Sequence, residues 1–277
     1  MLGILNQKTK GDYIMKLLTL NCHGWQEENQ LEKIKHLAAV IKEKQYDVIA
    51  LQEVMQLIDE NSDEKVKPDN YAVVLLDELM KLGVEDYRFV WDISHIGYDV
   101  YEEGSAILTR LEITGAKSFV VSQNTDIANY NTRRIIGLDL LHKEQPLSVY
   151  TCHFGWYHSE EDPFVKQVDQ LMTHLNLDHL NILMGDFNND ANEREEGYDY
   201  LIHKGWMDTY TAAETKDSGV TVTGKIDGWG NNKKDLRLDY ILTNQPVKVK
   251  SSAVIFNGEN KEVISDHFGV EVELELN

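Results

Sequence analysis

The sequence predicts an α/β (α+β) fold, a four-layer αββα sandwich in which helices flank two packed, mostly antiparallel β-sheets. Two observations carry this prediction. Short apolar segments of strand character fill the middle of the chain with little helix between them. Segments whose apolar residues recur at helical spacing bracket them. Because each sheet must bury an apolar face, two sheets packed together with helices outside is the economical arrangement.

The first elements alternate in type. Residues 16–21 (KLLTLN) are typical of a short buried strand, and apolar residues recur at helical spacing across 29–45. A second apolar strand is expected at 47–51 (DVIAL), followed by a helix over 71–82. A strand–helix–strand order indicates a crossover connection.

Strands dominate the rest of the chain. Two further helices are expected, at 163–177 and 195–204. The expected strands are 87–93, 105–109, 113–122, 134–141, 147–153, 181–184, 238–243, 247–256 and 268–276.

Length and composition favour a single domain. The chain has 277 residues, 42% of them hydrophobic, and shows no linker, repeat or low-complexity tract. We expect one domain over 15–277 and an N-terminal extension over 1–14. The extension lacks the apolar run of a signal peptide, and no stretch approaches the roughly 20 apolar residues of a membrane helix. These features predict a cytoplasmic monomer with no integral membrane segment.

The charge balance bears on the partners. There are 47 acidic and 27 basic residues, giving a net charge of −20. Such a surface repels nucleic acid at long range, although a bound cation reverses the field locally. Nucleic acid is therefore a possible partner that the charge does not favour. The two cysteines form no CxxC pair, which argues against a thiolate zinc site.

Polar residues recur where the predicted strands begin or end. Each has a local explanation, such as a turn, a helix cap or a surface histidine. Together, the carboxylates and amides among them make an oxygen-rich set that suits Mg²⁺ or Mn²⁺, and the histidines titrate near neutral pH. No GxSxG, P-loop, GxGxxG or helical His-x-x-x-His pattern is present. The residues are Asn21, Glu53, Glu103, His153, Asp186, Asn188, Asp239, Asp266 and His267.

Seven segments carry a resemblance to a known family. They are LTLN at 18–21, ALQE at 50–53, EGSAILTR at 103–110, TCHFG at 151–155, MGDFN at 184–188, RLDYIL at 237–242 and SDHFGV at 265–270. In this order they resemble the endonuclease/exonuclease/phosphatase (deoxyribonuclease I-like) superfamily. The resemblance spans the chain from its first strand to its last.

The resemblance implies a metal site. Glu53 corresponds to the principal ligand, Asn21 assists at the same metal, and Asp266 completes the carboxylate shell. A hard cation held there, Mg²⁺ or Mn²⁺, neutralises charge on phosphoryl oxygens and stabilises the leaving oxygen.

The same resemblance implies the catalytic roles. Asp186 and Asn188 would orient and deprotonate the attacking water. His267 would contact the phosphate or accept the proton, with Asp239 fixing its tautomer. Asp186 or His267 is the base, and Asp186 is favoured.

A second histidine and an arginine are also implicated. His153 would donate to the phosphate or protonate the leaving group, paired with Glu103. Arg133 precedes the strand leading to His153 and would grip a phosphate oxygen, with Arg134 as the alternative. Four further side chains line the cleft or pack at its rim: His23, Trp156, Tyr157 and His158.

These features predict a divalent-metal-dependent phosphoesterase that hydrolyses a phosphodiester or phosphomonoester by metal-assisted water attack. The substrate is expected to be a small or lipid-derived phosphate ester. A nuclease of the deoxyribonuclease or apurinic-endonuclease kind is the alternative. A non-catalytic binding module of the same fold comes last.

Overall fold

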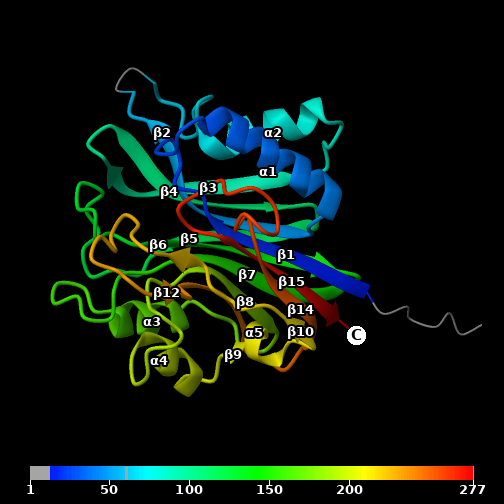
Figure 1. The fold of residues 1–277 in the computed structure, drawn as a ribbon, viewed down its shortest axis with the longest axis vertical. Coiled ribbons are helices and arrows are strands. Elements are labelled where there is room, and N and C mark those ends of the chain that lie inside the picture. Colours follow the sequence, from blue (N-terminus) through cyan, green and yellow to red (C-terminus); the bar gives the residue numbers. More distant parts are fainter. Residues whose placement is uncertain (1–12, 60–61, 277) are drawn as a thin grey trace, which may run out of the picture.

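The protein is described by a computed structural model that covers residues 13–59 and 62–276. Figure 1 shows two β-sheets lying against each other, with helices on both outer faces. Helices α1 (Gln30–Lys44) and α2 (Tyr71–Lys81) cover one sheet. Helices α3 (Phe164–Met172) and α4 (Gly197–His203) cover the other. The predicted four-layer αββα sandwich is confirmed.

The first sheet has seven strands, and β1 and β2 at its centre run parallel, joined by the α1 crossover. The remaining pairs are antiparallel, apart from the short β10–β14 pair. The order across the sheet is β10 (Thr215–Lys216), β14 (Lys248–Ile255), β15 (Gly269–Leu276), β1 (Tyr13–Asn21), β2 (Val48–Leu57), β4 (Tyr101–Thr109) and β3 (Arg88–Gly97).

The second sheet has six strands, and β7 and β8 at its centre run parallel, joined through α3. Its order is β5 (Glu112–Val120), β6 (Arg134–His142), β7 (Gln145–His153), β8 (Leu180–Asp186), β13 (Asp239–Thr243) and β9 (Met207–Asp208). A short helix α5 (Thr209–Ala212) and a two-stranded ribbon of β11 (Val222–Thr223) and β12 (Asp235–Leu236) complete the elements.

Buried apolar side chains form a core in each interlayer space. Between the sheets, Leu17 and Ala50 of the first sheet belong to one cluster with Val149 and Met184 of the second. Separate clusters fill the space under α1 and α2 and the space under α3 and α4. Burial on both faces explains why the central strands are almost continuously apolar in sequence.

Several predicted boundaries differ from the structure. The strand expected at 47–51 continues to Leu57. The helix expected over 163–177 ends at Met172, and the Asn181 side chain donates to the carbonyls of Asn176 and His179 in the segment between this helix and β8. The expected extension 1–14 lies outside the described residues except for positions 13 and 14, which begin β1.

Among the described residues, no helix is long and apolar enough to cross a membrane.

Candidate active site

The site forms at one end of the sandwich, where strands of both sheets bring polar residues together. Asn21 is the last residue of β1, His153 of β7 and Asp186 of β8. Asp239 begins the antiparallel strand β13 and lies opposite Asp186 in the register. His267 lies two residues before the first residue of β15, Gly269. Residues far apart in sequence therefore meet because the central strands of both sheets end at the same rim.

Glu53 reaches this rim in a different way from the one expected. It does not close a strand: β2 runs on to Leu57, and its register with β4 shifts between Leu51 and Val54. Glu53 lies within this irregularity. Its backbone φ is 53°, a left-handed conformation that residues other than glycine rarely adopt. Such bulges redirect side chains and are common beside active sites.

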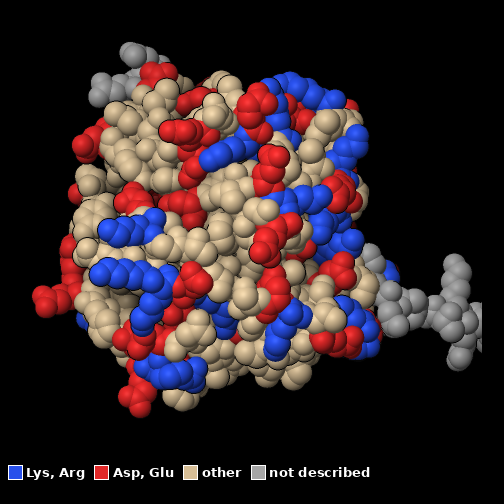
Figure 2. Space-filling model, in the orientation of Figure 1, with Lys and Arg blue, Asp and Glu red and all other residues tan. Residues whose placement is uncertain are grey.

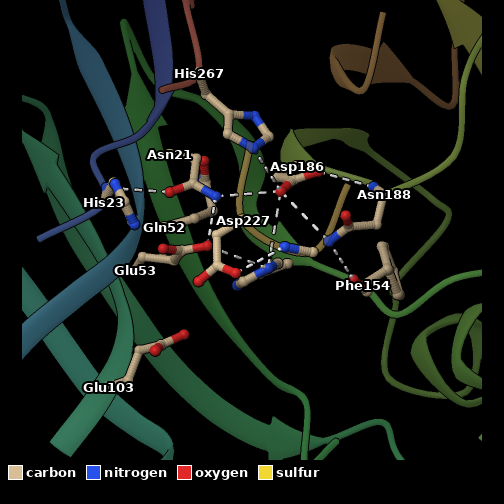
Figure 3. A network of polar contacts seen from close by, with 12 residues as sticks. Asn21, His23, Gln52, Glu53, Glu103, Phe154, Asp186, Asn188, Asp227 and His267 are labelled. Carbon is tan, nitrogen blue, oxygen red and sulfur yellow. Dashed lines mark hydrogen bonds and ion pairs between the residues drawn. The ribbon is translucent and has the colours of Figure 1, made fainter. Parts of the chain in front are cut away.

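Asp186 is the centre of the polar network in Figure 3. Its Oδ1 accepts a hydrogen bond from the Asn188 backbone amide at 2.8 Å. Its Oδ2 accepts from Asn21 Nδ2 at 3.2 Å and Asn188 Nδ2 at 3.4 Å. The Nε2 atoms of His267 and His153 lie 3.7 and 3.8 Å from the same oxygen. Burial and the charge of Asp239 raise the pKa of Asp186 to about 6, despite these favourable contacts.

Asp239 and His267 form the contact expected of them. His267 Nδ1 lies 2.9 Å from Asp239 Oδ2, and both side chains are buried. Burial by itself would lower the pKa of His267, but the negative charges of Asp239 and Asp186 outweigh it and raise the pKa well above its usual range. The structure therefore favours an imidazolium whose Nε2 faces the site.

The expected pairing of His153 with Glu103 stays a prediction: ligand atoms of these two residues and of Glu53 lie within 4.8 Å of one another, but the described residues show no hydrogen bond or ion pair between His153 and Glu103. The nearest imidazole to Glu103 belongs to His95, with Nε2 3.4 Å from Oε1, because the two residues face each other in the β3–β4 register. His153 Nε2 instead lies 3.9 Å from Glu53 Oε1 and 3.8 Å from Asp186 Oδ2. Burial and the positive charge of Arg133 lower the pKa of His153 well below its usual range, which favours the neutral imidazole.

The two carboxylates among the expected metal residues, Glu53 and Asp266, line the same cavity. Asn21 Nδ2 donates to Glu53 Oε1 at 2.8 Å. Asp266 Oδ1 lies 3.6 Å from His23 Nδ1. Burial, together with the charges of Glu103 and Asp266, raises the pKa of Glu53 to about 8. Carboxylates crowded in this way hold protons unless a cation replaces them, so the donor set fits a hard divalent ion.

The choice between two adjacent arginines follows from strand alternation. Arg133 is buried and lines the cavity at this rim, which we call the chamber. Its Nε has no hydrogen-bond partner among the described residues. Arg134 points the other way, where its Nη1 lies 3.3 Å from Ser118 Oγ and 3.5 Å from Asp92 Oδ2. Arg133 is therefore the one placed to contact an anion in the site.

Most of these residues line the chamber, which has a volume of about 270 Å³; Asn21 and Asp239 contact lining residues without lining it themselves. Of the four expected rim residues, Trp156 lines it, and His23 lies beside it in contact with Asp266. Tyr157 and His158 instead line an adjoining groove. The sequence reasoning missed His95, Tyr98, Tyr130 and Asp227, which also line the chamber. They lie in a strand and in loops without a recognisable motif, so only the fold identifies them.

Comparisons with known proteins agree with this geometry. The family model described as Endonuclease/Exonuclease/phosphatase family matches residues 18–267. A family protein from Leptotrichia buccalis is 43% identical over 95% of this chain and 100% of its own, with a TM-score of 0.89. A search of curated proteins gave no match.

Two more distant structures share the fold. A family protein from Bacteroides thetaiotaomicron is 19% identical over 96% of this chain and 99% of its own, with a TM-score of 0.71. A mannosyl-6-phosphatase from the same species is 19% identical over 95% and 100%, with a TM-score of 0.70. The fold, the ordered motifs and the match over most of the chain agree, and the chain belongs to the endonuclease/exonuclease/phosphatase family.

Proposed function

We propose that this protein is a divalent-metal-dependent phosphoesterase that directs water at a phosphorus atom. One observation carries the proposal: Asp186 Oδ2 lies at the focus of two amides and two imidazoles, beside a second group of carboxylates. A buried acid with a raised pKa, facing a polar chamber, is suited to accept a proton from water.

Glu53, Asn21 and Asp266 would hold the cation. Asn21 Oδ1 already accepts from the His23 amide at 3.2 Å and retains a second lone pair. When bound, Mg²⁺ or Mn²⁺ supplies charge neutralisation at the phosphoryl oxygens and at the leaving oxygen. The raised pKa of Glu53 supports this assignment, because an added positive charge would favour the ionised carboxylate.

The titration states of the two candidate bases favour Asp186 over His267. An imidazolium cannot accept a proton, and the pKa of His267 is raised well above its usual range. His267 Nε2 is instead placed to donate to a phosphate oxygen. Asp186 takes the proton from water, and the Asn188 amides hold its carboxylate in place.

The remaining polar groups would bind the phosphate. The lowered pKa of His153 favours its neutral form, so we assign it as a hydrogen-bond donor rather than as the acid for the leaving group. Arg133 offers a buried guanidinium that has no carboxylate within 4.0 Å in residues 13–59 and 62–276. An arginine in this state is well suited to a phosphate oxygen.

The substrate is small or lipid-derived. The net charge of −20 disfavours a polyanion, and a fold relative is named as a mannosyl-6-phosphatase. Both points are consistent with a compact phosphate ester.

The test is a hydrolysis assay on p-nitrophenyl phosphate and bis(p-nitrophenyl) phosphate with Mg²⁺ or Mn²⁺. We expect metal-dependent turnover that falls by about 10²–10⁴-fold in Asp186→Asn. Glu53→Gln should lose turnover and bind the metal more weakly in calorimetry. The matched control is Asp139→Asn, an acid-to-amide change in β6 outside the chamber. Unaltered turnover in Asp186→Asn and Glu53→Gln, or no hydrolysis of any phosphate ester or plasmid DNA with either metal, would refute the proposal.

A further inference from the structure

The guanidinium assigned to phosphate binding depends on a long loop for its position. Arg133 is the last residue of the segment 121–133, which joins β5 to β6. The two ends of this loop pair with each other: the Val121 amide donates to the Arg133 carbonyl at 2.9 Å, and the Arg133 amide donates to Ser122 Oγ at 2.9 Å. The Arg133 Nε has no hydrogen-bond partner in residues 13–59 and 62–276. The position of the side chain therefore depends on the backbone from which it departs.

Contacts with β3 tie this loop to the first sheet. The Ile96 amide donates to the Ile127 carbonyl at 2.7 Å. His95 Nδ1 lies 3.2 Å from the carbonyl oxygen of Thr132. A carbonyl oxygen only accepts, so Nδ1 carries the proton in this hydrogen bond. Thr132 is fully buried and directly precedes Arg133, so the His95 ring holds the backbone where Arg133 enters the chamber.

The other ring nitrogen of His95 faces β4. Its Nε2 lies 3.4 Å from Glu103 Oε1, and His95 as a whole is only 5% exposed. The register of β3 with β4 shifts between Ile93 and His95, and such bulges redirect side chains. His95, Glu103 and Arg133 line the same chamber. Both ring nitrogens are thus engaged, one with the loop that carries Arg133 and one with β4, and neither is left for a phosphate.

The position of a guanidinium decides how tightly it binds phosphate. A mobile arginine loses side-chain entropy when it binds, whereas a guanidinium already held at the site does not. A displacement of about 1 Å also disturbs its paired hydrogen bonds to the phosphate oxygens. A buried histidine that fixes residue 132 can therefore control phosphate affinity without contacting the phosphate.

We propose, on the basis of the phosphoesterase function above, that His95 is a positioning residue for phosphate binding and acts through Arg133. The hydrogen bond from Nδ1 to the Thr132 carbonyl carries the effect, because it holds the backbone beside Arg133. The contact of Nε2 with Glu103 keeps the ring in the orientation that this hydrogen bond requires.

Two substitutions separate the two ring nitrogens. In His95→Asn the amide nitrogen takes the place of Nδ1 and still donates to the Thr132 carbonyl. In His95→Gln it takes the place of Nε2, and that carbonyl loses its donor. Titration calorimetry of inorganic phosphate into the Mg²⁺-loaded protein is the measurement. We expect Kd to rise at least about tenfold in His95→Gln and in Arg133→Ala, and less than about threefold in His95→Asn.

The control is His142→Gln, the same substitution at a buried residue of β6 outside the chamber, and it should leave Kd unchanged. A double variant tests whether His95 acts through Arg133. Once Arg133→Ala has removed the guanidinium, adding His95→Gln should weaken phosphate binding no further. In steady-state assays of His95→Gln, KM for p-nitrophenyl phosphate should rise with Kd while kcat changes less than about threefold, since the lost interaction is one of binding.

The outcomes separate this inference from the proposed function. Equal losses in His95→Asn and His95→Gln, additive losses in the double variant, or unaltered phosphate affinity in Arg133→Ala would overturn the role of His95 and leave the phosphoesterase intact. If no ester is hydrolysed, the phosphoesterase fails, and the calorimetry still tests His95. If His95→Gln does not fold, His95→Ala also lacks the donor and takes its place in each comparison. A wild-type protein that binds no phosphate would overturn both proposals.

Discussion

Asp239 controls the charge state of His267 through a hydrogen bond of 2.9 Å between buried side chains. We predict that Asp239→Asn lowers the pKa of His267, because the largest favourable charge beside the imidazole is removed. If the imidazolium binds phosphate, activity should fall by about 10²-fold or more. The alkaline limb of the kcat/KM profile should move to lower pH, because His267 would lose its proton earlier.

Two measurements check this prediction. NMR titration follows the His267 ring, and steady-state assays follow activity from pH 5 to pH 10. Asp139→Asn serves as the control. A His267 pKa that does not change in Asp239→Asn would contradict the assigned electrostatics.

Glu53 links metal binding to stability. Its pKa is raised from 4.5 to about 8 in the folded protein, so the folded state holds a proton that the unfolded state releases near pH 4.5. The free energy of unfolding of the metal-free protein should therefore fall as pH rises from about 4.5 to 8. A cation removes this penalty, so Mg²⁺ should raise Tm more at pH 8 than at pH 5.

Calorimetric melting with and without the metal measures this effect. At a Mg²⁺ concentration of 100 times Kd, the expected stabilisation is about 2.7 kcal/mol, or roughly 5 °C. In Glu53→Gln the dependence on pH should shrink. An increase in Tm that is equal at both pH values would count against Glu53 as the titrating ligand.

At the scale of elements, the close approach of β7 and β8 holds His153 beside Asp186. Gly185 has a φ of 152°, and a Cβ added there would lie 1.9 Å from the Cys152 carbonyl oxygen. We predict that Gly185→Ala destabilises the protein by about 2–3 kcal/mol, because the two parallel strands must separate. Urea unfolding measures the loss.

The matched substitution is Gly230→Ala. No atom lies within 4 Å of the added Cβ there, so the free energy of unfolding should change by less than about 0.5 kcal/mol. Equal stabilities for the two variants would show that the strand pair tolerates the extra atom.

The bulge in β2 is the element-scale feature that sequence reasoning did not find. Residues 48–51 form an apolar run that Gln52 and Glu53 follow, and no residue type in them marks an irregular register. The shift depends on how β2 pairs with β4, a strand that lies about fifty residues further along the chain. Helix α1 and the central strands were predictable, because periodicity and burial are local signals.

At the scale of the molecule, the net charge of −20 affects the rate at which an anionic substrate reaches the protein. Acidic and basic side chains are interspersed on the face shown in Figure 2, so the excess of acids is not confined to one patch there. We predict that kcat/KM for an anionic phosphate ester rises a few-fold between 20 and 200 mM NaCl at saturating Mg²⁺, because salt screens the repulsion. kcat should change little, because salt alters the encounter of substrate and protein and not the steps that follow binding. A fall in kcat/KM with salt would indicate that a local positive field dominates.

The sequence by itself determined the layered fold, the family and the residue types at the site. Apolar periodicity sets the elements, and the ordered motifs from LTLN to SDHFGV carry the family. Tertiary structure decided which groups meet: it brought His95 to Glu103, and it turned Arg133 rather than Arg134 toward the chamber. It also brought Tyr98 to Asp227 and Trp229 to Asn188. The reason is physical, because pairing and pKa depend on distance, burial and strand register, and these arise only when the two sheets pack.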